Sequence, residues 1–258
     1  MERWIICLLC WGVFLFGYSD RDMDGVDDRY DHCPDTALSD LVDLNGCTIK
    51  HLRDMGYFDM RIGTYLMKDR DFGLIQNSLQ IGYSTSKFTV RLRGSYFDGD
   101  RGAGLNDTYL SGEYLLYRDS NFCLYIGGGL VLPTYQKREE NRLDLEGSFL
   151  LQYTYEDWRI FGSEYYTIVG DQADESQNYE DMLFSMLGVG YYWHENHYSS
   201  LSYQRGSSLY KNETEMRYLS WFEYYKIDQS WFVHLRYTYG LNTLAMDQKI
   251  GGDIGYRW

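Results

Sequence analysis

After residue 17, the chain of 258 residues has no apolar run approaching the ~20 residues that a membrane-spanning helix needs. It is also short of bases, because 24 Lys and Arg stand against 38 Asp and Glu and leave a net charge of −14. Phosphate neutralisation requires a basic surface, so we expect no nucleic-acid partner. The aromatic share is 18%, which excludes an intrinsically disordered chain. A helical membrane protein is excluded as well.

The first 19 residues are predicted to be a secretory signal. Arg3 precedes an apolar stretch of 14 residues that ends at Gly17. This stretch fits the hydrophobic region of a signal peptide and is too short to span a bilayer as a helix. Gly17 and Ser19 are small residues two apart, so we place cleavage after Ser19 and exclude residues 1–19 from the fold.

Export makes disulfides possible, and the mature chain keeps three cysteines. Cys33 and Cys47 bracket a short loop within one segment, whereas Cys123 lies far away in a strand-like run. The economical pairing is therefore Cys33–Cys47, with Cys123 left as a buried thiol. Closing a loop of this length stabilises the folded segment by roughly 3 kcal/mol, because it restricts the unfolded chain.

The mature chain begins with six aspartates within twelve residues. Asp20, Asp22 and Asp24 alternate, and Gly25 follows them. Alternating carboxylates in a loop converge on one point, and a glycine lets the backbone turn so that a carbonyl can join them. The pattern predicts a site for a hard cation. The alternative is a solvated acidic linker, but so many carboxylates in a compact loop repel one another strongly without a cation.

The same segment resembles a known calcium-binding repeat. The pattern DxDxDGxxDxxDxCP over residues 20–34 is similar to a thrombospondin type-3 repeat. VDLNGC at residues 42–47 resembles the close of the repeats that serve as linkers in outer-membrane protein A-like proteins. The resemblance covers a single repeat and implies Ca²⁺ as the cofactor. The ligands that it implies are the side chains of Asp20, Asp22, Asp24, Asp28 and Asp31 and the carbonyl of Val26.

From residue 56 onward, apolar and polar residues alternate with a period of two. In residues 142–155 and 248–258, for example, one face is apolar and the other carries charge. Such segments of about ten residues are typical of a half-solvated sheet or of a transmembrane β-barrel. The predicted strands are 57–67, 72–83, 87–97, 108–117, 121–132, 142–155, 158–168, 181–193, 198–205, 214–226, 230–239 and 248–258.

The connections between these runs favour the barrel. Short turns and longer polar loops alternate along the chain, with one exception at the first hairpin. Outer-membrane barrels have short periplasmic turns and longer outer loops, and an even strand number brings both termini to the periplasm. The final Trp258 resembles the C-terminal aromatic signal of bacterial outer-membrane proteins. We therefore predict an all-β, antiparallel transmembrane barrel of about 12 strands over residues 56–258, in contact with outer-membrane lipid, with residues 20–55 as a periplasmic Ca²⁺-binding segment.

The strand periodicity assigns charges of both signs to the lumen. A barrel of this size falls between small filled barrels and wide porins, so we predict a narrow pore for the passive passage of small solutes. The mixed charge argues against strong ion selectivity. The predicted lumen residues are Arg61, Arg91, Arg93, Glu113, Asp144, Glu146, Arg217, Arg236, Lys249, Asp253 and Arg257, together with Asp59 and Glu223.

Two other functions are open. As a structural, tethering or adhesion-related protein, the chain would use its calcium segment as a periplasmic spacer or as a dock for a periplasmic protein. As a lipid hydrolase, it would use His197 and Ser199, whose spacing resembles the outer-membrane phospholipase motif. The asparagine-glycine that follows in that family is absent, since Ser200 and Leu201 stand there. We predict no enzyme activity and assign no catalytic residue.

Overall fold

The computed structural model describes residues 20–36, 40–50, 56–70, 72–100, 102–135, 141–170, 179–209 and 215–258. The predicted signal at residues 1–19 lies outside these ranges. The chain divides into two compact units, residues 1–55 and 56–258. Among the described residues, no helix has the length and apolarity that a membrane crossing requires.

The described residues of the first unit are mostly turns and bends. Its only described regular structure is an antiparallel pair of short strands, β1 (Leu41–Val42) and β2 (Thr48–Lys50). Asp43 organises the turn between them, because its carboxylate accepts the backbone N–H groups of Asn45 and Cys47 at 2.8 and 3.1 Å. Asx turns of this kind satisfy backbone donors in a segment too short to build a ladder.

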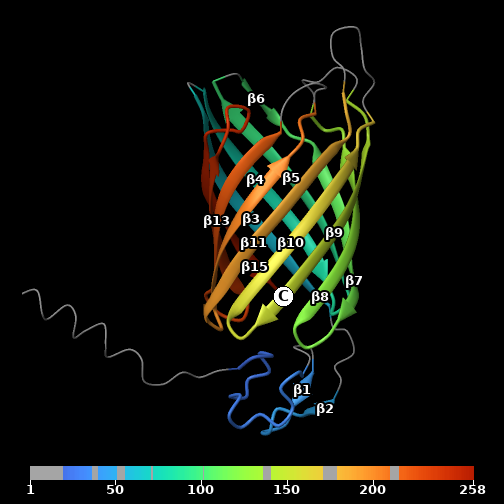
Figure 1. The fold of residues 1–258 in the computed structure, drawn as a ribbon, viewed down its shortest axis with the longest axis vertical. Helices are drawn as coiled ribbons and strands as arrows, with labels where there is room; N and C mark the ends of the chain where they lie inside the picture. Colours follow the sequence, from blue (N-terminus) through green and yellow to red (C-terminus); the bar gives the residue numbers. More distant parts are fainter. Residues whose placement is uncertain are drawn as a thin grey trace, which may run out of the picture. The chain divides into compact units, whose positions relative to one another are not determined.

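The second unit is a closed barrel of twelve antiparallel strands, as predicted (Figure 1). Each long strand pairs with its neighbours in the chain, and the last strand pairs with the first along its whole length, which closes the sheet. A short additional strand, β6 (Gly102–Leu105), extends the loop after β5. The twelve strands are β3 (Tyr57–Asp69), β4 (Phe72–Ser84), β5 (Phe88–Gly99), β7 (Thr108–Arg118), β8 (Phe122–Leu132), β9 (Asp144–Tyr155), β10 (Trp158–Ile168), β11 (Met182–His194), β12 (His197–Gly206), β13 (Met216–Lys226), β14 (Trp231–Gly240) and β15 (Gln248–Arg257).

The two ends of the barrel differ. At one end the strands are joined by turns as short as residues 156–157 and 195–196. The strand ends Leu132, Asp144, Ile168 and Met182, which longer segments connect, lie at the other end (Figure 1). The barrel also begins and ends at the short-turn end, where Phe58 and Trp258 exchange two backbone hydrogen bonds of 3.0 Å. The β3–β4 hairpin is the one short connection at the end that otherwise carries the longer loops, as its sequence indicated.

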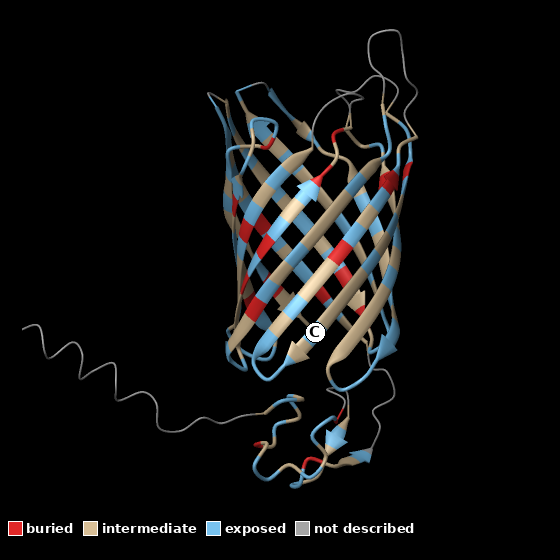
Figure 2. Cartoon of the chain, viewed as in Figure 1, coloured by how far each residue is buried: buried red, intermediate tan, exposed pale blue. Residues whose placement is uncertain are grey.

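The barrel wall is apolar outside and polar inside. Along β3, Phe58, Met60 and Ile62 are exposed, whereas Asp59 between them is only 3% exposed. Figure 2 shows the same alternation of exposed and less exposed residues around the barrel. An exposed Leu or Ile forgoes roughly 1.5–3 kcal/mol relative to full burial, so a surface covered by such residues is unfavourable in water. It suits a lipid surface.

Aromatic rings gather on the outside of the short-turn end. Trp231, Tyr256 and Trp258 form a chain of ring contacts with centroids 4.8 and 5.9 Å apart. Such belts occur where a membrane barrel meets the headgroup region. Not every aromatic residue near a strand end belongs to this outer belt. Tyr57 and Tyr192 share the face of the polar lumen residues instead.

Candidate functional site

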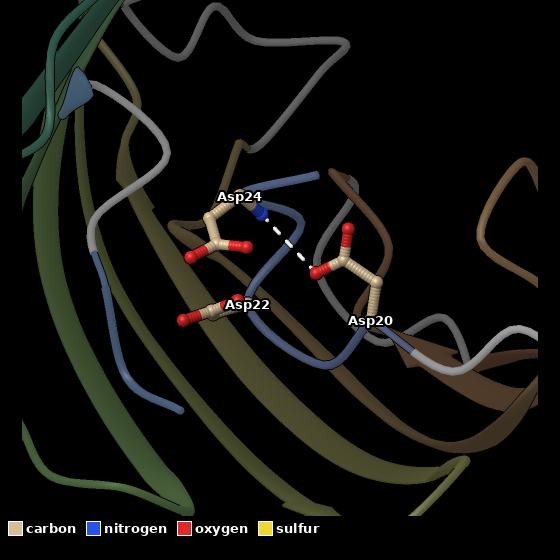
Figure 3. Close-up of side chains that lie close together, drawn as sticks. All are labelled: Asp20, Asp22 and Asp24. Atoms are coloured by element: carbon tan, nitrogen blue, oxygen red, sulfur yellow. Dashed lines mark hydrogen bonds between the residues drawn. The ribbon is translucent and has the colours of Figure 1, made fainter. Parts of the chain in front are cut away.

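Three alternating aspartates of the first unit converge. One carboxylate oxygen from each of Asp20, Asp22 and Asp24 can be chosen so that all three lie within 4.8 Å of one another (Figure 3). Asp20 closes the loop, because its two oxygens accept the backbone N–H groups of Asp24 at 3.1 Å and Gly25 at 2.8 Å. Gly25 has a φ of +96°, a conformation that side-chain-bearing residues rarely adopt.

Buried oxygens without hydrogen-bond partners identify the centre of this cluster. Asp22 Oδ1, Asp24 Oδ2 and Asp31 Oδ2 are buried and accept no hydrogen bond. The other oxygen of each carboxylate is held by a backbone N–H. The donors are Thr36 to Asp22 at 2.6 Å, Val26 to Asp24 at 2.8 Å and Cys33 to Asp31 at 2.7 Å. Ionised carboxylates are acceptors only, so a cation or a proton beside these buried oxygens would stabilise them.

The pKa of Asp22 reflects the crowding of these carboxylates. Its burial, opposed by the N–H of Thr36 and assisted by the charges of Asp24 and Asp31, raises the pKa of Asp22 to about 6. Carboxylate oxygens on a loop are the ligands that Ca²⁺ prefers, and its coordination tolerates irregular geometry. The donor set therefore fits a calcium ion better than a metal that requires nitrogen or sulfur ligands.

The second motif makes room for these carboxylates. Gly46 has a φ of +73°, and a Cβ built on it would overlap the carboxylate of Asp31 and come close to Oδ2 of Asp24. The predicted disulfide Cys33–Cys47 is formed, with Cα atoms 5.0 Å apart. It joins the chain beside Asp31 to the chain beside Gly46. The glycine and the disulfide thus act together on the position of Asp31.

The other residues of the segment have hydrogen bonds and ion pairs of their own. Asp28 Oδ1 accepts the N–H of Arg21 at 2.8 Å, and Val26 donates its N–H to Asp24. Asp27, which the resemblance does not include, pairs with Arg29 at 2.6 Å, and this contact lowers the pKa of Asp27 to about 2. The buried oxygens without a hydrogen-bond partner are those of Asp22, Asp24 and Asp31.

In the barrel, the structure places most of the predicted lumen residues on the inward face. The alternation of burial along the strands and the register between them assign this face. The residues on it are Asp59, Arg61, Arg91, Arg93, Glu113, Asp144, Glu146, Arg236, Lys249, Asp253 and Arg257.

The assignment of Arg217 and Glu223 to the lumen was wrong. Both lie on the face of β13 that carries exposed Leu219 and Trp221, with an exposed fraction of 55% for the Arg217 side chain. The cause is local, because β13 has aromatic residues on both faces and its alternation is weak. Arg217 faces Arg205 of β12 in register, with Glu215 contacting both guanidinium groups.

Opposite charges inside the barrel form pairs. Arg61 Nε lies 3.0 Å from Asp59 Oδ1, and Arg91 Nη1 lies 2.9 Å from Glu113 Oε2. Asp253 lies 2.8 Å from His234 Nδ1. These contacts engage the carboxylates of Asp59, Glu113 and Asp253.

Two further observations concern Arg159, which the sequence analysis did not assign, and Cys123, which it expected to be buried. Arg159 of β10 faces inward and lies over the rings of Tyr192 and Tyr198, at 4.9 and 5.7 Å. Because Trp158 and Ile160 face outward, the alternation along β10 could have placed Arg159 in the lumen from the sequence. Cys123 is free as predicted, but it is half-exposed rather than buried.

The His-x-Ser spacing does not form a nucleophile–base pair. His197 and Ser199 both lie on the outward face of β12, where His197 Nε2 is 2.7 Å from Glu223 Oε2. Ser199 Oγ instead accepts the indole N–H of Trp193 at 2.7 Å. Among the described residues, no hydrogen bond joins the histidine to the serine, which a hydrolase of this type requires.

Comparison with known proteins gives a match in structure alone. No family model matches the chain, and no curated protein sequence does either. Among solved structures, an outer-membrane channel from Pseudomonas putida F1 has a TM-score of 0.61 at 13% identity, over 79% of this chain and 94% of that chain. The NanC porin has a TM-score of 0.56 at 12% identity, over 77% and 98%. The KdgM porin has a TM-score of 0.55 at 8% identity, over 78% and 98%.

The barrel has the fold of outer-membrane channels. This fold explains why residues 56–258 have an apolar exterior and ion pairs in the interior, the reverse of a water-soluble protein.

Proposed function

We propose that this protein is an outer-membrane channel through which small solutes pass passively. The observation that carries the proposal is solvent exposure inside a closed wall. Arg93 and Arg236 face the lumen and are nevertheless exposed. Water therefore reaches charged groups in the interior. The likeness in fold to proteins described as porins and channels supports the proposal. Twelve strands favour a narrow passage rather than a wide one.

The asymmetry of the barrel supports an orientation. In outer-membrane barrels the short turns lie in the periplasm and the longer loops face outward. Under this rule residue 56, where the barrel unit begins, lies at the periplasmic end, and the calcium segment that precedes it is periplasmic. An ordered segment there would act as a spacer or as a contact for a periplasmic protein.

Single-channel recording tests the channel proposal. The mature protein, refolded in detergent and inserted into a planar bilayer, is expected to produce discrete conductance steps, because a solvated lumen conducts ions. A folded barrel that inserts without any conductance would contradict the proposal and favour a structural role. Release of fatty acid from the bilayer lipid would instead indicate a hydrolase.

We propose further that the first unit binds Ca²⁺. Three buried carboxylate oxygens on Asp22, Asp24 and Asp31 lack any partner, and this observation supports the proposal. The disulfide joins the chain beside Asp31 to the chain beside Gly46, and Gly46 leaves room for the carboxylates of Asp31 and Asp24. Asp20 contributes by closing the loop, and its proximity to Asp22 and Asp24 keeps it within reach of the ion.

Calcium binding is expected to weaken at acid pH. Because the pKa of Asp22 is raised to about 6, a proton occupies this carboxyl at pH 5 in the metal-free protein and is largely absent at pH 7. A cation must displace that proton, so the apparent affinity should fall roughly tenfold from pH 7 to pH 5. Isothermal titration calorimetry of the mature protein at the two pH values measures the change. An affinity equal at both would contradict the assignment of Asp22 as a ligand.

A further inference from the structure

Among the described residues, several inward-facing cations form no ion pair, Arg159 and Arg257 included, and three others belong to one part of the wall. Arg93 on β5, Arg236 on β14 and Lys249 on β15 have no carboxylate within 4.0 Å among the described residues. Each instead contacts an aromatic ring. The ring centroids lie 5.4 Å from Arg93 (Tyr109), 5.4 Å from Arg236 (Phe222) and 4.7 Å from Lys249 (Tyr65).

These three cations belong to one part of the wall. β14, β15, β3, β4 and β5 are consecutive neighbours in the closed sheet. Lys249 Nζ reaches across β3 and lies 3.4 Å from Gln76 Oε1 of β4. The positive charges of Arg93 and Arg236 both act on the ammonium group of Lys249. We call Arg93, Arg236 and Lys249 the cationic band.

Two carboxylates lie near this band, and neither forms an ion pair with it. Asp253 accepts the hydroxyl of Tyr65 at 3.0 Å and lies 2.8 Å from His234 Nδ1. Glu146 on β9 is near enough for its charge to interact with Arg93, but it interacts with Glu113 as well and forms no ion pair with the arginine. Aromatic rings orient a cation and leave its charge in place. Three like charges on one stretch of wall repel one another, and the repulsion is relieved when an anion enters. Such a focused field raises the local concentration of anions.

We propose that the cationic band binds small oxyanions with two or more negative charges, such as di- and tricarboxylates or phosphate, and makes the channel anion-selective. The proposal rests on the channel function argued above. Guanidinium groups match the geometry of carboxylate and phosphate oxygens, and the ammonium group of Lys249 adds a third set of donors. The result differs from the weak selectivity expected from a mixed lumen charge, because the acids of the lumen are largely engaged by other groups.

Reversal potentials in a KCl gradient test the selectivity. The wild-type channel is expected to prefer chloride over potassium by several-fold. Combined Arg93→Gln, Arg236→Gln and Lys249→Gln substitutions should bring the ratio to one or below, since Glu146 then dominates this level of the lumen. Arg217→Gln is the matched control, because this arginine lies on the outward face and should leave the ratio unchanged.

Citrate added to one side tests binding. It should reduce the chloride current of the wild-type channel at millimolar concentration and have at least tenfold less effect on the triple variant. The single variant Lys249→Gln, which keeps both arginines, should fall between the two and replaces the triple variant if that protein does not fold.

The outcomes separate this inference from the channel proposal. If the folded wild-type protein shows no conductance, the channel proposal fails, and the inference fails with it. If the wild-type channel conducts but prefers potassium, or if the Gln variants keep the chloride preference and the citrate block, the channel stands and the cationic band is not its selectivity site.

Discussion

Substitution of both Asp22 and Asp24 by Asn is expected to weaken Ca²⁺ binding by at least on the order of 100-fold, because affinity in oxygen-ligand sites follows the number of charged ligands. Asn keeps the size of the side chain and its ability to accept the N–H of Thr36 or Val26. The change therefore removes charge from two of the three buried oxygens and preserves the shape of the loop. Calorimetry at pH 7 on the mature protein measures the loss.

The single variant Asp22→Asn should lose part of this affinity, and Asp35→Asn is its matched control. Both remove one carboxylate from the same segment, but Asp35 is exposed and lies outside the cluster. Its substitution should leave the affinity within about twofold, since an exposed charge in water contributes little at a distance. The migration of the folded barrel on unheated gels should be the same for all variants. Wild-type affinity in the double variant would exclude these carboxylates as ligands.

Gly46→Ala is expected to abolish Ca²⁺ binding, whereas Gly25→Ala should not. Both glycines have positive φ, at +73° and +96°, so both substitutions incur backbone strain of roughly 1–2 kcal/mol. The two sites differ in what the new methyl group meets. At position 46 it overlaps the carboxylate of Asp31, and at position 25 nothing lies within 4 Å.

Measuring the calcium affinity of the two variants separates strain from displacement of a ligand. If only Gly46→Ala loses binding, the position of Asp31 is essential to the site. Equal losses would mean that loop conformation alone decides binding and that Asp31 contributes no ligand. Both variants keep the disulfide, and a free-thiol assay should detect only Cys123 in the mature protein.

The fold class was accessible to sequence reasoning because strand periodicity is local. Each predicted run overlaps one of the twelve barrel strands, and the alternation of short and long connections identified the two ends. Such signals need only neighbouring residues, since side chains in a strand alternate between two faces. The method failed on β13, where aromatic residues occupy both faces and Arg217 was placed inside.

In the first unit, the sequence alone determined which ligand chemistry is present, because a run of alternating aspartates defines it. It could not determine which oxygens remain without partners. That depends on backbone donors from distant turns, such as Thr36 for Asp22, and on the approach of Gly46 to Asp31. The disulfide was predictable from spacing, since only one pair of cysteines lies in the same segment.

For the barrel, the sequence by itself determined that the lumen carries charges of both signs. Only the tertiary structure decided which of them cancel. Arg91 meets Glu113 across neighbouring strands, whereas Lys249 acts together with Arg93, which is far away in the sequence. Charge pairing depends on the register between strands and on closure of the sheet, and the periodicity of a single strand determines neither. The uncompensated cations are therefore a property of the closed barrel and not of any one segment.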